Sequence, residues 1–73
     1  MNGGSGVMNY NYCLYCLTHA EDDLCGELSD EEYDLVSEAI LCLENCVVKE
    51  LDLTLEEELV VDGALGLIGM YGY

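Results

Sequence analysis

The chain has 73 residues, of which 16 are acidic, one is a lysine and none is an arginine, so its formal net charge is -15. This balance excludes direct binding to nucleic acid, which needs several lysines or arginines to contact phosphates, and attraction to an anionic membrane surface. Because 52% of the residues are hydrophobic, the composition predicts a small folded domain and not a disordered acidic tail.

We expect residues 1–8 to be a flexible leader and residues 9–73 to form a single acidic domain. Met8-Asn9 repeats Met1-Asn2, so translation could start at either methionine. The leader has neither the basic residue nor the apolar run of a secretory signal. The most apolar stretch, residues 64–73, is much shorter than the ~20 residues that a membrane span needs. A cytoplasmic protein without membrane contact is therefore predicted.

The first predicted element is a helix over residues 9–27. Its apolar residues recur at spacings of three and four, as on one face of a helix: Tyr10, Cys13, Leu14, Leu17 and Ala20. Gly26 is expected to supply a left-handed C-terminal cap. A short strand over residues 9–13 is the alternative, because tyrosine alternates there with other residues and favours strands.

The second predicted helix begins at Asp30 and ends near Leu51. Ser29 and Glu32 have the spacing of a capping box, in which each side chain accepts a hydrogen bond from the other residue's backbone N–H. One apolar stripe follows: Tyr33, Val36, Ile40, Leu43, Val47 and Leu51. A second stripe lies beside it: Leu35, Ala39, Cys42 and Cys46. Two stripes predict that this helix packs against two neighbours.

The opposite face of this helix is polar and mostly acidic: Asp30, Asp34, Glu38, Asn45 and Asp52. Carboxylates four residues apart repel one another and weaken a helix by a few tenths of a kcal/mol per pair. A solvated surface is the usual explanation of such a face. The near absence of basic residues from the whole chain favours a binding role, because solubility alone does not require it.

A third helix is predicted after Thr54, which has the capping-box partner Glu57. Its apolar residues continue to Tyr71 at helical spacing: Val60, Val61, Ala64, Leu67, Ile68 and Tyr71. Glycine recurs at every third position from Gly63 to Gly72, and each glycine costs a helix interior about 1 kcal/mol relative to alanine. We therefore expect another backbone to pack closely against the glycine side of this helix.

The favoured fold class is an all-α, small three-helix domain. The alternative is an α+β domain with a C-terminal β-hairpin that turns at Asp62-Gly63, a dipeptide typical of two-residue hairpin turns.

Five cysteines raise the question of a metal. Cys13, Cys16, His19 and Cys25 could supply four zinc ligands, although their spacing matches no common zinc finger. Cys13 and Cys16 could instead face Cys42 and Cys46 across two helices and hold one zinc or two disulfides. The favoured interpretation is that the cysteines are free, small and mostly buried hydrophobic residues. No cofactor is expected, and no catalytic residues are assigned, because the chain contains no catalytic motif and is too short for a substantial pocket. We predict that it is not an enzyme.

The charge pattern predicts a small inhibitor that binds a basic, nucleic-acid-handling protein and occludes its nucleic-acid site. Carboxylates on a rigid helix would take the place of phosphates. In size and charge the chain is similar to the DNA-mimic and anti-CRISPR inhibitors of phages and mobile elements. The expected partner-binding residues are the carboxylates of the second helix and its flanks: Glu21, Asp22, Asp23, Asp30, Glu31, Asp34, Glu38, Glu56, Glu57 and Glu58.

The alternative function is that of an obligate assembly or adaptor protein, which binds through an apolar face rich in glycine and tyrosine. Tyrosine is favoured at protein interfaces, and the chain has six tyrosines. A homodimer belongs to this alternative, because half of the residues are hydrophobic and a domain of this size cannot bury them all.

Overall fold

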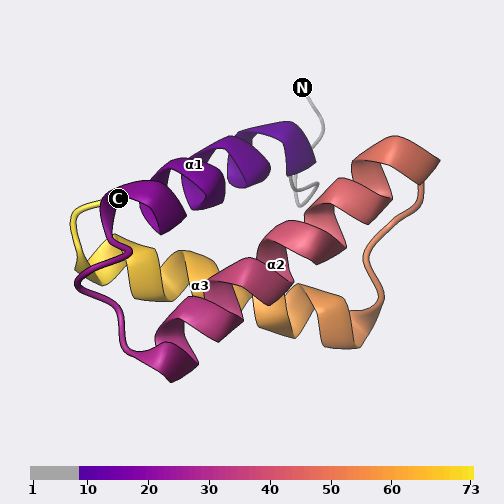
Figure 1. Cartoon of the computed structure of the whole chain (residues 1–73). Helices are drawn as coiled ribbons and strands as arrows, with labels where there is room; N and C mark the ends of the chain where they lie inside the picture. Colours follow the sequence, from indigo (N-terminus) through magenta and orange to yellow (C-terminus); the bar gives the residue numbers. More distant parts are fainter. Residues whose placement is uncertain (1–8) are drawn as a thin grey trace.

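The computed structural model describes residues 9–73, and these fold into three helices (Figure 1). They are α1 (Tyr10–Asp23), α2 (Asp30–Lys49) and α3 (Leu55–Met70). The predicted all-α three-helix domain is confirmed. Residues 9–73 contain no strand, so neither the hairpin at Asp62-Gly63 nor the short strand over residues 9–13 is supported. The expected leader, residues 1–8, lies outside the described residues.

Each helix begins at a side chain that caps it. Asn9 accepts a hydrogen bond from the backbone N–H of Tyr12 at 3.0 Å. At the start of α2, Ser29 and Glu32 form both hydrogen bonds of the predicted capping box, at 3.2 and 2.9 Å. Thr54 and Glu57 do the same at the start of α3, again at 3.2 and 2.9 Å. These caps satisfy backbone donors that have no partner inside the helix.

The helix ends differ from the prediction. Helix α1 stops at Asp23, where Leu24 caps it with φ of -104°, so the expected left-handed cap at Gly26 is wrong. Helix α2 stops at Lys49, and the next residue, Glu50, adopts the left-handed conformation with φ of 55°. A residue with a Cβ atom is disfavoured there by about 1–2 kcal/mol, so a glutamate at this position does not predict a cap.

The core forms where the three helices meet. Its buried residues are Cys13, Leu17 and Ala20 of α1, Val36, Ala39, Ile40, Leu43 and Cys46 of α2, Val61, Ala64 and Ile68 of α3, and Leu24 and Leu53 of the connections. The middle of the apolar stripe predicted for α2 is therefore confirmed. Its two ends are wrong, because Tyr33 and Leu51 are 38% and 58% exposed at or beyond the ends of the helix. Both predicted stripes contribute to the core, as expected for a helix with two neighbours.

Helix α2 is the central element, since α1 and α3 each contact it far more than they contact each other. Figure 1 shows α2 crossing the molecule diagonally and the end of the chain lying beside the end of α1. Tyrosine hydroxyls join segments that are distant in sequence. The Tyr73 hydroxyl donates to Asp23, and the Tyr10 hydroxyl accepts from the backbone N–H of Leu53 at 3.3 Å.

The glycine row of α3 faces outward. A Cβ atom built on Gly66 or Gly69 would meet no atom within 4 Å, and one built on Gly63 would meet only a methyl group of Leu35 at 3.7 Å. The expectation that another backbone packs against these glycines is therefore wrong within residues 9–73. The outer side of α3 also exposes three large apolar residues: Leu55, Leu59 and Met70.

Across the described residues, none of the helices combines the length and the apolar character that crossing a bilayer requires.

Candidate partner-binding face

The acidic face of α2 is exposed along the first half of the helix. Asp30, Asp34 and Glu38 all point to solvent, and four residues of helix separate successive carboxylates by ~6 Å along the axis. The lone lysine, Lys49, stands eleven residues after Glu38, which is about 16 Å of helix. This exceeds the Debye length of ~8 Å at physiological ionic strength. Within residues 9–73, therefore, no lysine or arginine is positioned to neutralise these three carboxylates.

The last turn of α1 adds carboxylates beside this face. The Glu21 carboxylate is half-buried and accepts a hydrogen bond from the Ser37 hydroxyl of α2 at 2.6 Å. Because Ser37 lies between Asp34 and Glu38 in sequence, this bond fixes the end of α1 next to the acidic half of α2. Asp22 stays exposed, whereas Asp23 accepts the hydrogen bond from Tyr73.

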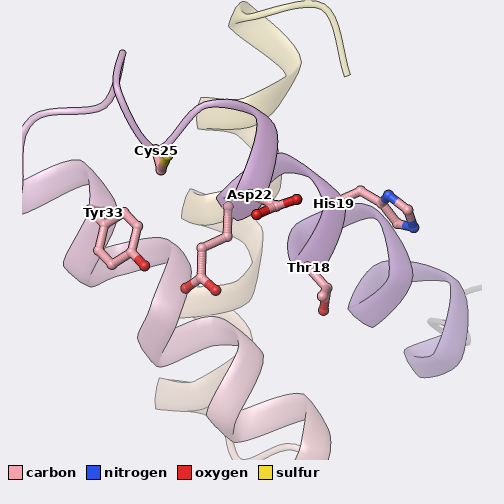
Figure 2. A pocket seen from close by; sticks show the side chains of 6 residues that line it. Thr18, His19, Asp22, Cys25 and Tyr33 are labelled. Carbon is pink, nitrogen blue, oxygen red and sulfur yellow. The ribbon is translucent and has the colours of Figure 1, made fainter.

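A shallow hollow of about 440 Å³ opens between the end of α1 and the start of α2. Glu21, Asp22 and Tyr33 line it together with Thr18, His19 and Cys25. Figure 2 shows Tyr33 on the α2 side and Asp22 on the α1 side, with the His19 ring turned outward. That ring packs on Tyr15 with the ring centroids 4.2 Å apart. The hollow therefore presents carboxylates and a phenol, and not a histidine poised over a cysteine.

The remaining predicted carboxylates fall into two groups. Glu31 lies in the first turn of α2, near Asp30 and Asp34. Glu56, Glu57 and Glu58 lie in the first turn of α3, which begins after the far end of α2 (Figure 1). The Glu57 carboxylate is engaged in capping α3. The structure thus brings the α1 and α2 carboxylates together and places the α3 group at the other end of the molecule.

An apolar groove adjoins the acidic face, and the sequence analysis missed it. Leu14 of α1 and Leu41 and Val48 of α2 line a groove of about 380 Å³, with Val47, Glu44 and Asn45. Leu41 is 61% and Val48 79% exposed. The signal was present in the spacing, because Leu41 and Val48 fall on the same helical face as Asp34 and Asn45.

The cysteines do not form a cluster. All five, each within residues 9–73, are free. Burial, the largest cause, raises the pKa of the Cys13, Cys42 and Cys46 thiols, and the Glu57 carboxylate adds to the shift at Cys42 and Cys46. In the described part of the chain, no three His, Cys, Asp or Glu side chains are grouped so that they could hold a metal ion. The set Cys13, Cys16, His19 and Cys25 is therefore not brought together, nor is the cross-helix set with Cys42 and Cys46.

No family model, curated protein or solved structure matches this chain.

Proposed function

We propose that this protein is a small acidic inhibitor that binds a basic, nucleic-acid-handling protein and occludes its nucleic-acid site. The observation that carries the proposal is the exposed row of Asp30, Asp34 and Glu38 on α2, which no basic side chain of the chain neutralises. Asp22 and Glu31 extend the same negative surface. Lysines and arginines that are arranged for phosphates can engage a rigid row of carboxylates in the same way.

The physics of the free protein supports a basic partner. Mutual repulsion of the carboxylates persists in the isolated chain and is relieved when a positive surface approaches. Attraction of this kind speeds association and makes it sensitive to salt. DNA-mimic and anti-CRISPR inhibitors of phages and mobile elements act in this manner, and action in the cytoplasm is part of the proposal.

The test is simultaneous charge reversal of Asp30, Asp34 and Glu38 to lysine. Immobilised wild-type protein should capture from lysate a nucleic-acid-binding protein, and an oligonucleotide should compete for that protein. The triple variant should capture none of it. A matched variant that reverses Glu50, Asp52 and Asp62, which are also exposed, carries the same net charge and should capture it normally.

Two results would contradict the proposal. If the Asp30, Asp34 and Glu38 variant binds as tightly as wild type, the acidic row is only a solvated surface. If both charge variants lose binding equally, net charge and not the α2 face is responsible.

A second candidate function, assembly through an apolar face, is favoured by the outer side of α3. Leu55, Leu59 and Met70 are 76%, 66% and 84% exposed there, and residues 63–73 carry no charged side chain. A helical segment that is apolar all round, as residues 63–70 are, is normally buried. Binding through this face should hardly respond to salt, whereas binding through the carboxylates should weaken steeply. Measuring the affinity for the captured partner, and the mass of the free protein in solution, at low and high salt separates the two candidates.

A further inference from the structure

The apolar groove between α1 and α2 is open to solvent. Leu14, half-buried on α1, lines it together with Leu41 and Val48 of α2. Two large apolar side chains that are 61% and 79% exposed beside a hollow are typical of a surface that another molecule covers.

The groove and the acidic row form one continuous surface. Leu41 lines the groove and also lines a neighbouring hollow with Asp34, Ser37 and Glu38. Along the outer face of α2, the residues alternate by four and three positions: Asp34, Glu38, Leu41, Asn45 and Val48. This row is ~21 Å long. Its first half is negative, and its second half carries the apolar Leu41 and Val48 on either side of Asn45.

A second copy of the chain does not fit this surface. If two copies paired antiparallel, Asp34 and Glu38 of each would be buried against Leu41 and Val48 of the other. If they paired parallel, carboxylates would face carboxylates. Both arrangements bury unpaired charge, which is strongly unfavourable, and both bring together chains of net charge -15. The occupant must instead carry positive charge at one end and apolar side chains at the other.

We propose that the outer face of α2, with Leu14, binds a basic amphipathic helix of the partner. Its apolar side chains enter the groove between Leu14, Leu41 and Val48, and its lysines or arginines contact Asp34 and Glu38. A helix of about 14 residues spans the face, and helix-in-groove binding is a common mode of peptide recognition. The inference rests on the proposed function, because it requires a basic partner. It adds that the bound segment of that partner is an amphipathic helix.

The two halves of the face should respond differently to substitution. Loss of Leu41 and Val48 should weaken binding at every salt concentration, because apolar contact is not screened. Neutralisation by Asp34→Asn with Glu38→Gln should reduce the salt dependence itself, because two of the screened attractions are gone.

The experiment uses a synthetic basic peptide as the probe. Its leucines lie at positions i, i+4 and i+7 in one half of the helix, and its lysines and arginines continue the same face in the other half. A second peptide has the same composition with the leucines scattered around the helix. Each is titrated into isotope-labelled full-length protein at low and at moderate salt, and amide chemical shifts are recorded. We expect shifts centred on Leu14, Leu41 and Val48, and about tenfold weaker binding of the scattered peptide.

A matched pair of variants completes the design. Leu41→Ser with Val48→Ser should weaken binding of the amphipathic peptide about tenfold. Tyr12→Ser with Leu51→Ser changes two similarly exposed residues outside the groove and should leave binding unchanged. All four residues are exposed, so the variants should fold, and the dispersion of their spectra verifies this.

Three results would overturn the inference. They are equal binding of both peptides, an unaffected Leu41 and Val48 variant, and shifts centred on Leu55 and Leu59 instead of the groove. None of these results bears on the proposed function. That function is tested separately, by whether the variant reversed at Asp30, Asp34 and Glu38 still captures the partner. If that variant keeps the captured partner while the groove variant loses it, the acidic proposal fails and the groove alone is responsible.

Discussion

At the scale of single residues, the cysteines show how burial controls reactivity. Cys25 is exposed, Cys16 and Cys42 are half-buried, and Cys13 and Cys46 belong to the core. The thiolate is the reactive form of cysteine, and burial, which disfavours that charged form, raises the pKa of Cys13 and Cys46. The two core thiols therefore behave as small hydrophobic side chains.

Alkylation should follow this order. With iodoacetamide at about pH 8, Cys25 should be modified first, and Cys13 and Cys46 should be modified at an appreciable rate only when the protein unfolds. Peptide mass spectrometry over a time course, with and without urea, measures each rate. Modification of Cys46 as rapid as that of Cys25 in the native protein would contradict the packing described for α2.

At the scale of secondary structure, the glycines of α3 lower the stability of the helix without a compensating contact. Gly66 lies in the helix interior, and the space where its Cβ would lie is empty. Glycine there retains flexibility in the unfolded chain that is lost on folding.

Gly66→Ala should therefore stabilise the protein by about 1 kcal/mol, measured by urea unfolding. Gly72→Ala is the control, because Gly72 has φ of +104°, where an alanine is strained, and this variant should gain nothing or lose stability. If Gly66→Ala is destabilising, an unseen contact covers that side of α3. If the variant is more stable but loses the partner, the α3 face is the binding surface.

The sequence was sufficient to predict where the helices start and insufficient to predict where they end. Ser29 and Thr54 cap the starts of α2 and α3 through local hydrogen bonds, which depend only on residues three positions away. The end of α2 depends on Glu50 accepting a disfavoured backbone conformation, and no local pattern encodes that. Tyr33 and Leu51 continue a helical stripe, yet no neighbouring helix buries them there.

The same distinction holds for the candidate site. The row of Asp30, Asp34 and Glu38 follows from helical spacing alone and was predictable. The contact of Glu21 with Ser37, and the position of Leu14 beside Leu41, depend on how α1 packs against α2. Because they arise from tertiary structure, spacing along one segment could not reveal them.

At the scale of the whole molecule, the high net charge makes the carboxylates repel one another. The radius of gyration of the described chain is 12.2 Å, and the net charge is -15. The Debye length is ~30 Å at 0.01 M salt and ~3 Å at 1 M. At low salt nearly all pairs of carboxylates therefore repel one another, and at high salt only the nearest pairs do.

Salt should accordingly strengthen the fold. The free energy of unfolding in urea should rise by on the order of a few kcal/mol between about 0.01 M and 1 M sodium chloride. The variant reversed at Asp30, Asp34 and Glu38 should show a smaller rise, because it carries less charge. A salt-independent stability would mean that repulsion contributes equally to the folded and unfolded chains. Salt would thus stabilise the protein while weakening its proposed complex.

The hydrogen bond from Tyr73 to Asp23 makes the end of the chain sensitive to alkali. The bond raises the pKa of Tyr73 from 10.0 to about 12. Since the folded value lies above the unfolded one, the bond stabilises the fold fully below about pH 10 and is lost as the pH rises towards 12.

Tyrosines are the only aromatic residues besides His19, so ultraviolet absorbance can follow their ionisation. Tyr73→Phe should remove the last step of that titration, and an unchanged curve would contradict the contact. In alkaline solution the chain end should release α1 before the helices separate.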